Sequence, residues 1–350
     1  MRLIHTSDLH LGSPMTASLG KDAAKIRRQE LRETPERLAG EAERLGCEGI
    51  IIAGDLFDSN TPSAVEAELF LATVRRHPKI AFFLLRGNHD SGVEYASSHL
   101  PKNLYIFGDK PTEYKIGEVS LIGSSRTGKS VFSGLELDRG RVNILVLHGA
   151  VGGGGEGSIS MADARGLGID YLALGHYHAY SEYRIDTRGV CVYSGTPEGR
   201  GFDEAQECGY VLIDTARGLK HTFVPFAKRR ILSIDVDISQ AFVINDIEEL
   251  IQNALKNIAD GSIVRVRLVG TRHPGLIYDA DFLCVHFSGR FFHLEIIDST
   301  KPAEVLTEDG GVRSLKQEFL RLVDSSGLDE KTKARVRELG IQALLGGKVR

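Results

Sequence analysis

Five short, mostly apolar segments in the first half of the chain each end in an Asp, Asn or His. The segments span residues 3–6, 49–53, 80–85, 142–147 and 171–174. Apolar runs of this length predict strands that are buried on both faces, which is typical of parallel sheets. Open α/β sheets bind ligands at the carboxyl edge, so the polar residues after these strands are expected to gather there.

Helical patterns separate these segments. Residues 22–45 have apolar positions at helical spacing, and Pro35 is expected to kink or split that helix. Thr61-Pro62 has the residue types of a helix start, so a second helix is predicted over residues 62–75 and a third over residues 93–99. The alternation of strands and helices predicts a largely parallel sheet with helices outside it.

Short strands with glycine turns replace this alternation at residues 104–122 and again at residues 183–226. We therefore expect an α/β fold in which two sheets stack between helices, an α-β-β-α sandwich over residues 1–226. Lys228-Arg229-Arg230 marks the predicted boundary of this domain.

The chain beyond this boundary predicts a small α/β domain and a helical tail. The domain spans residues 229–300, with strands expected at 231–236, 262–269 and 291–297 and helices at 246–258 and 278–285. A polar linker is expected at residues 301–311, and the segment 312–350 should form two helices, 313–323 and 329–345. Residues 311–350 hold nine Lys or Arg and five Asp or Glu, which is a net charge of +4. Because the whole chain has a net charge of −4, residues 1–310 carry −8.

The tail helices carry two apolar stripes, Leu315, Phe319 and Leu322 on the first and Val336, Leu339 and Ala343 on the second. The stripes either pack on their own protein or bind a partner by helix-in-groove packing.

The polar residues at the strand ends have the residue types of metal ligands. They are Asp8, His10, Asp55, Asn88, His148, His176 and His178. Asp8 and His10 are two residues apart, as are His176 and His178, so each pair would point the same way in extended backbone. Oxygen and imidazole donors without thiolates favour manganese, iron or zinc. Seven ligands are too many for one catalytic ion but fit two ions roughly 3.5–4 Å apart with a bridging carboxylate, a pair that can clamp a phosphate and activate water.

The order of these motifs resembles that of the calcineurin-like metallophosphoesterases. The order is Asp-x-His, Gly-Asp, Gly-Asn-His-Asp, His and Gly-His-x-His. Residues 6–12 and 53–58, together with Tyr193-Ser194-Gly195-Thr196-Pro197 and Gly201-Phe202-Asp203-Glu204, resemble the narrower group of SbcD-type DNA repair nucleases. The resemblance covers about residues 1–226 well and the remainder in outline.

The resemblance implies a role for each site residue. One ion would be held by Asp8, His10 and His178, the other by Asn88, His148 and His176, with Asp55 bridging. His89 would protonate or shield the leaving alkoxide, and Asp90 would orient the His89 imidazole. Some relatives have a histidine where this chain has Asp58, which puts an exonuclease role for that position in doubt.

The resemblance also implies cofactors and partners. The ions would be manganese, the substrate DNA, and the partner an SbcC-like ATPase bound through the C-terminal helices. Two copies would form a homodimer through the helices at 62–75 and 93–99, with Leu69 and Phe70 as candidate contacts.

Composition adds limits to these expectations. No run of about 18 apolar residues occurs, so no membrane span is expected, and the polar N-terminal run does not fit a signal peptide. The four cysteines have no CxxC spacing and indicate reduced thiols in a cytoplasmic protein. The net charge of −4 argues against a free-standing sequence-specific DNA binder, although bound ions or a partner can supply positive charge.

Two rival functions remain open. One is a calcineurin-like phosphatase or small-molecule phosphodiesterase, although that enzyme would need neither the small domain nor the tail helices. The other is a nucleotide-binding module, because Gly123–Ser130 fits the P-loop pattern. That module requires a long helix after the loop, and Gly134 interrupts the segment too soon. The glycine-rich stretch Gly152–Gly157 contains a formal GxGxxG but precedes no predicted long helix, so we interpret it as a flexible loop after the strand that ends at His148, with a role in admitting or gripping substrate left open.

Overall fold

The computed structural model describes residues 1–15, 19–90, 100–126, 129–152, 158–302 and 315–344. These residues form two compact units, each described by itself. The first comprises Met1–Ser233, Ile258–Arg265 and Phe287–Glu295, and the second comprises Ile234–Asn257, Val266–His286 and Ile296–Arg350. The predicted helix at 93–99 and most of the predicted linker at 301–311 lie outside the described residues.

Two six-stranded sheets form the first unit. The first sheet has the order β12-β11-β1-β2-β3-β4, in which β1 to β4 are parallel and β11 and β12 are antiparallel to their neighbours. Its strands are β1 (Arg2–Thr6), β2 (Gly49–Ala53), β3 (Ala81–Leu85), β4 (Leu104–Ile106), β11 (Gly209–Asp214) and β12 (Lys220–Pro225).

The second sheet has the order β5-β6-β7-β8-β10-β9, with a parallel centre from β6 to β10 and one antiparallel strand at each edge. Its strands are β5 (Thr112–Ile116), β6 (Val119–Gly123), β7 (Val142–His148), β8 (Tyr171–Gly175), β9 (Ser181–Arg184) and β10 (Val190–Tyr193). All five strands predicted to carry ligands are therefore parallel members of these two sheets.

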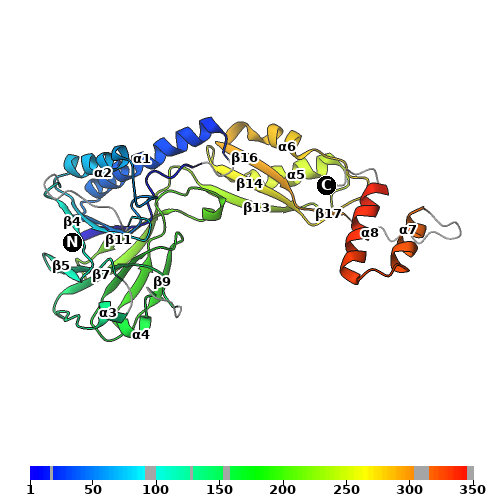
Figure 1. Ribbon diagram of the computed structural model, residues 1–350. Helices are drawn as coiled ribbons and strands as arrows, with labels where there is room; N and C mark the ends of the chain where they lie inside the picture. The colour runs from blue at the N-terminus through cyan, green and yellow to red at the C-terminus, as the bar shows by residue number, and fades with distance from the viewer. Residues whose placement is uncertain (16–18, 91–99, 127–128, 153–157, 303–314, 345–350) are drawn as a thin grey trace. The chain divides into compact units, whose positions relative to one another are not determined.

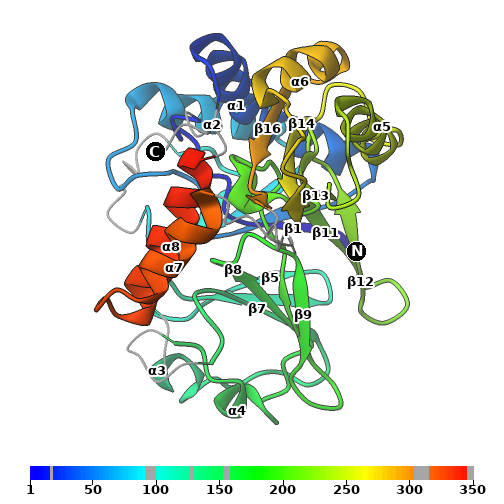
Figure 2. The same cartoon turned by 90° about the vertical axis from the view of Figure 1, so that its right-hand side faces the viewer.

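The two sheets stack face to face between helices, which confirms the predicted α-β-β-α sandwich (Figures 1 and 2). Successive residues of a strand face opposite layers: Leu3 packs between the sheets, and Ile4 packs under the outer helices α1 (Lys21–Arg44) and α2 (Ala64–Arg76). Side chains of the second sheet also alternate between the layer that separates the two sheets and an outer layer, which α3 (Lys129–Phe132) and α4 (Met161–Ala164) cover. The apolar runs are continuous because both faces of these strands are buried.

Two helix details differ from the sequence prediction. Pro35 does not split α1, which continues for 24 residues. Residues on both sides of the proline, including Leu31 and Leu38, pack into one core cluster, and that packing holds the helix together. The start of α2 is Ser63, whose hydroxyl accepts the backbone N–H of Glu66 at 3.2 Å, rather than Thr61-Pro62.

A three-stranded sheet of order β13-β14-β16 follows, and the unit boundary falls within its strands. The remaining elements are β13 (Ile231–Asp237), α5 (Ile244–Leu255), β14 (Ile263–Val269), β15 (Thr271–Arg272), α6 (Ala280–Phe287), β16 (His293–Asp298) and β17 (Lys301–Pro302). The order of β13, α5, β14, α6 and β16 is the predicted one, shifted by one or two residues at most ends, whereas the two-stranded sheet of β15 and β17 was not predicted. The predicted domain limits, 1–226 and 229–300, stay a prediction.

The tail forms two helices that pack on each other, α7 (Leu315–Asp324) and α8 (Glu330–Leu344) (Figure 1). A Cβ on Gly340 would overlap the Phe319 ring, so the missing side chain of this glycine is what lets the helices approach. Leu322 remains 56% exposed. Across the described part of the chain, none of the helices has the length and apolar character that a membrane crossing requires.

Candidate metal centre

The strand ends of the two sheets meet because glycines leave room for them. A Cβ on Gly54, after β2, would overlap the imidazole of His148, which ends β7. A Cβ on Gly175, at the end of β8, would overlap the carbonyl oxygen of Ala53. Both contacts join one sheet to the other. The glycines beside the predicted ligands therefore set how closely the two sets of strand ends approach.

The backbone at the site is held in an uncommon conformation. Five non-glycine residues among those described have positive φ, and four are predicted ligands: Asp8 (54°), His10 (47°), Asp55 (51°) and His176 (102°). Such angles cost of order 1–3 kcal/mol each and gather at functional sites. The expectation that Asp8 and His10 lie in extended backbone is wrong. They converge because the N–H groups of Asp8 and His10 bond to the carbonyl oxygens of Gly54 and Asp55, each at 3.0 Å.

Three histidines place their two ring nitrogens in the same way. His148 Nδ1 lies 2.9 Å from a backbone carbonyl oxygen at the end of β2. His178 Nδ1 lies 2.7 Å from Glu204 Oε1, and His10 Nδ1 lies 3.1 Å from Asp58 Oδ1. Because an ionised carboxylate or a carbonyl oxygen can only accept, the Nδ1 atoms of His148 and His178 carry a hydrogen, and their Nε2 atoms face inward. Histidines that bind metal ions through Nε2 are held in this way.

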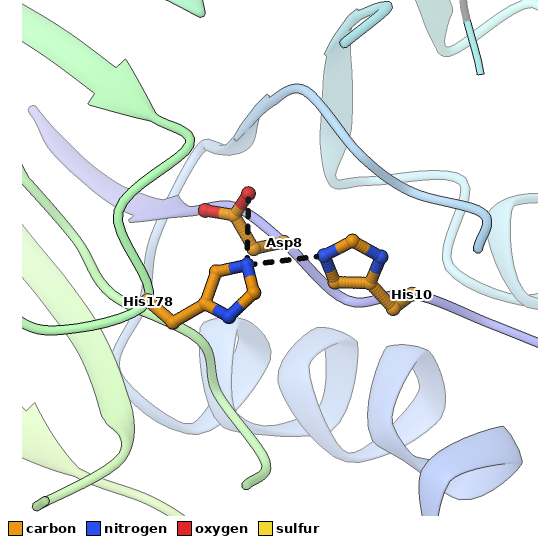
Figure 3. Close-up of side chains that lie close together, drawn as sticks. All are labelled: Asp8, His10 and His178. Carbon is orange, nitrogen blue, oxygen red and sulfur yellow. Dashed lines mark hydrogen bonds and ion pairs between the residues drawn. The ribbon is translucent and has the colours of Figure 1, made fainter. Parts of the chain in front are cut away.

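The inward nitrogens lie at the distances expected around a cation. His10 Nε2 and His178 Nε2 are 3.2 Å apart, and His178 Nε2 is 3.9 Å from Asp8 Oδ1 (Figure 3). The two Nε2 atoms are hydrogen-bonded, so one of them carries a hydrogen, and a cation that replaced this hydrogen would be bound by both nitrogens. The donor set of this group fits a divalent transition-metal ion.

A second group of donors lies beside the first. Asp55 Oδ2 is 3.4 Å from His148 Nε2 and 3.9 Å from His10 Nε2, so this carboxylate lies between the two groups. Asn88 Oδ1 is 2.9 Å from His148 Nε2. The donor atoms of Asp8, Asp55 and His148 all lie within 4.8 Å of one another. The residues present therefore fit two ions.

The electrostatic field of the site favours positive charge. Burial raises the pKa of Asp55, but a hydrogen bond and the charge of His148 lower it by more, to about 2. Burial lowers the pKa of His148, but its hydrogen bond to Asp55 and the charges of Asp8 and Asp55 raise it to about 9. The same carboxylates that hold a proton on His148 would stabilise a metal cation in its place.

The two other predicted histidines lie at the edge of the centre. The backbone N–H of His176 donates to both carboxylate oxygens of Asp8 at 3.1 Å, and its half-buried ring meets the His148 ring at 5.5 Å between centroids. His89 is exposed, its N–H donates to Asp55 Oδ1 at 2.9 Å, and its ring packs edge-on against the His10 ring at 4.9 Å.

The predicted role of Asp90 is wrong in this structure. Its carboxylate is buried and accepts the backbone N–H groups of Gly87 at 2.6 Å and Leu56 at 2.8 Å, instead of contacting the His89 imidazole. His89 is exposed and Asp90 is buried, so the two neighbouring side chains lie in different surroundings. Asp90 ties the turn after β3 to the end of β2.

Three residues that support the centre were not predicted as site residues: Asp58, Arg200 and Glu204. Arg200 donates to Asp58 Oδ1 at 2.9 Å and to Glu204 Oε1 at 2.7 Å, so one guanidinium joins the two carboxylates behind His10 and His178. Burial raises the pKa of Glu204, but hydrogen bonds from His178 and Arg200 lower it to about 2. The Gly-Phe-Asp-Glu motif contained Glu204, but nothing in the sequence linked it to a histidine 26 residues away.

The local structure does not support a P-loop. The helix after Gly123, α3, has four residues and does not provide the long helix that such a loop requires. A Cβ on Gly123 would overlap the Phe107 ring, which gives this glycine a packing role. Most of the Gly152–Gly157 stretch lies outside the described residues.

Comparison with known sequences decides the family. The sequence model described as calcineurin-like phosphoesterase matches residues 1–180, just over half of the chain and the part that carries every predicted ligand. The chain belongs to the calcineurin-like phosphoesterase family. Divalent-metal phosphoester chemistry therefore agrees with the donor geometry above.

Two named relatives resemble more of the chain. The "DNA double-strand break repair protein Mre11" of Sulfurisphaera tokodaii is 26% identical over 267 residues, which cover 69% of this chain and 65% of that protein. The chain thus spans just under two thirds of that relative. The SbcD subunit of the SbcCD nuclease of Staphylococcus epidermidis is 26% identical over 317 residues, covering 78% and 80% respectively. The solved structure of TT1561 from Thermus thermophilus has a TM-score of 0.42 and 13% identity, covering 63% of this chain and 98% of that one.

Proposed function

We propose that this phosphoesterase is a two-metal DNA nuclease. The observation that carries the proposal is the shared arrangement of His10, His148 and His178, whose Nε2 atoms converge on Asp8 and Asp55. Two named relatives, a nuclease subunit and a DNA double-strand break repair protein, favour DNA over a small phosphoester as substrate.

Each ligand has a proposed place. Asp8, His10 and His178 would hold one ion, Asn88, His148 and His176 would hold the other, and Asp55 would contribute to both. Two divalent ions supply charge for a phosphate and activation of the attacking water when bound, and manganese suits this mixture of oxygen and imidazole donors. The proposed proton donor to the leaving oxygen is His89, whose exposed ring lies beside the His10 ring.

Metal content and cleavage test these roles together. Wild type with Mn²⁺ should cleave single-stranded, hairpin or blunt duplex DNA, and Asp55→Ala should lose bound metal and cleavage. His89→Ala should keep both ions and lose about 100-fold or more in turnover, the range of a general acid. Activity on small phosphoesters without any DNA cleavage would instead support a phosphatase, and loss of an ion in His89→Ala would make His89 a ligand.

We further propose that the tail helices bind a partner ATPase, as the resemblance of the sequence implies and the name of a nuclease subunit supports. Gly340 and Phe319 pack α7 and α8 on each other, while Leu322 stays 56% exposed and available for a partner. Leu322→Glu should weaken co-purification with an ATPase encoded beside this protein, without lowering the melting temperature. Unchanged binding would remove Leu322 from the partner surface.

We also propose a homodimer, but only one of its two candidate contact residues remains. Phe70 is fully buried in the core cluster under α2 and cannot contact a second copy, whereas Leu69 is half-buried. Light scattering of wild type and Leu69→Glu would test the dimer. A wild-type protein that is monomeric at micromolar concentration would exclude it.

A further inference from the structure

A groove of about 540 Å³ lies beside the metal-ligand histidines His176 and His178. Its walls include Tyr177 and Tyr183 on one part and Asp203, Glu204 and Gln206 on another. The volume falls in the range of ligand-binding clefts. None of the proposed metal roles uses the two tyrosines, although Tyr177 stands between two ligands in sequence.

The two tyrosines present aromatic surface that is held in place. Tyr177 is 44% exposed and Tyr183 is 49% exposed. Both rings rest on Tyr193, with centroids 4.8 Å and 6.4 Å away. Tyr193 is fully buried, and its hydroxyl donates to the carbonyl oxygen of Gly149 at 2.9 Å and accepts the N–H of Val151 at 2.8 Å. Because the buried Tyr193 ring supports both outer rings, Tyr177 and Tyr183 lose less conformational entropy when they bind a flat ligand.

The charge of the groove selects against a phosphate. Asp203 and Glu204 line it, and Asp203 is exposed. Arg200 offsets the charge of the buried Glu204 carboxylate, so the Asp203 carboxylate is the charge that would repel a phosphodiester there. A neutral, flat group with polar edges has no such penalty, and Gln206 and Ser181 in the wall offer hydrogen-bonding groups to its edge. The phosphate is instead attracted to the adjacent metal centre. A nucleotide has both parts, a phosphate and a flat base.

We propose that this groove is a nucleobase subsite, in which Tyr177 and Tyr183 stack on the base of a nucleotide next to the phosphodiester under attack. The proposal rests on the proposed DNA nuclease function and adds how the enzyme would distinguish DNA from other phosphoesters. Every base has a flat aromatic face, so such stacking tolerates any sequence.

Oligonucleotides with one abasic tetrahydrofuran residue test the subsite. Moved along an otherwise identical strand, the abasic residue should lower wild-type kcat/KM at one position by about 10-fold or more, the value of a lost stacking contact. Tyr183→Ala should lose as much on the intact strand and should no longer distinguish the abasic strand from it. Tyr183→Phe, the matched control, should behave as wild type because the ring remains.

Tyr177→Ala and Tyr177→Phe form a second pair, with bound Mn²⁺ measured in each because the position adjoins two ligands. Tyr177→Phe should still cleave the intact strand better than the abasic strand. Tyr177→Ala should cleave the two strands equally while it binds as much Mn²⁺ as wild type. Equal cleavage of intact and abasic strands by wild type at every position would overturn the subsite and leave the nuclease proposal intact. Hydrolysis of bis(p-nitrophenyl) phosphate without any cleavage of DNA would overturn both.

Discussion

Replacement of Glu204 by glutamine removes one charge behind a metal ligand and changes almost no volume. Glu204 Oε1 lies 2.7 Å from His178 Nδ1, and its other oxygen accepts the backbone N–H of Arg200 at 2.7 Å. A glutamine can place its oxygen at only one of these positions. If the oxygen faces Arg200, its NH₂ group faces His178 and forces the hydrogen onto Nε2, which then cannot bind a metal. If the oxygen faces His178, two N–H donors face each other at Arg200.

The expected result is weaker binding of one ion. Loss of a hydrogen-bond partner behind a ligating histidine typically costs about 10- to 100-fold in metal affinity. That corresponds to about 1.4–2.8 kcal/mol at the site that includes His178. In the proposed assignment the second ion does not use His178, so it should bind as in wild type. A Mn²⁺ titration by calorimetry should therefore separate into a tight and a weakened step in Glu204→Gln.

A carboxylate–histidine pair elsewhere in the chain provides the control. Glu182 Oε2 lies 2.7 Å from His221 Nε2, and His221 packs against Tyr171, at the opposite end of β8 from His176. Glu182→Gln should leave both binding steps unchanged. If Glu204→Gln also binds both ions as wild type does, while the metal-free proteins melt alike, Glu204 does not act through His178 and the reasoning fails.

Three other substitutions test separate features. Gly54→Ala puts a side chain at a φ of 95° and into the His148 ring, so it should lower the free energy of unfolding by about 1–3 kcal/mol and reduce bound Mn²⁺, measured by urea unfolding and metal analysis. Burial lowers the pKa of His77, but hydrogen bonds to Glu43 and a second glutamate raise it above 6.5. Its stabilisation is therefore complete below pH 6.5 and lost as the pH rises through the folded-state pKa, so His77→Gln should destabilise more at about pH 6 than at about pH 8.5; equal losses would contradict this. Gly340→Val should separate the tail helices and speed limited proteolysis there; unchanged cleavage would show that the close approach is unnecessary.

The layered fold and the convergence of ligands could be predicted because both depend on local patterns. Continuous apolar runs identified the parallel strands, and parallel strands must bring their carboxyl ends to one edge. The prediction that Pro35 would kink or split the helix used only the low helix propensity of proline, which is a local property. The packing of Leu31 and Leu38 that keeps α1 whole is a tertiary contact. The prediction for Asp90 paired its carboxylate with the neighbouring His89, whereas in the structure it accepts backbone N–H groups of Gly87 and Leu56.

The ring orientations could not be predicted for the same reason. The hydrogen on His148 Nδ1 is fixed by a carbonyl of β2, 95 residues away, and that on His178 by Glu204. Arg200 gave no signal at all, because an arginine is usual at a surface and its two carboxylate partners come from distant segments.

Gly54 and Gly175 make the distance between the two sheets part of the metal site. Each stands where one sheet touches the other, against His148 and against the carbonyl of Ala53. Asp8 and Asp55 come from one sheet and His148, His176 and His178 from the other, so each proposed ion would take ligands from both sheets, and the gap between the sheets sets how far apart those ligands lie. Core side chains between the sheets, far from any ligand, therefore also determine the distances between the ligands. A substitution there that widens the gap by a fraction of an ångström would change the chemistry without touching the site.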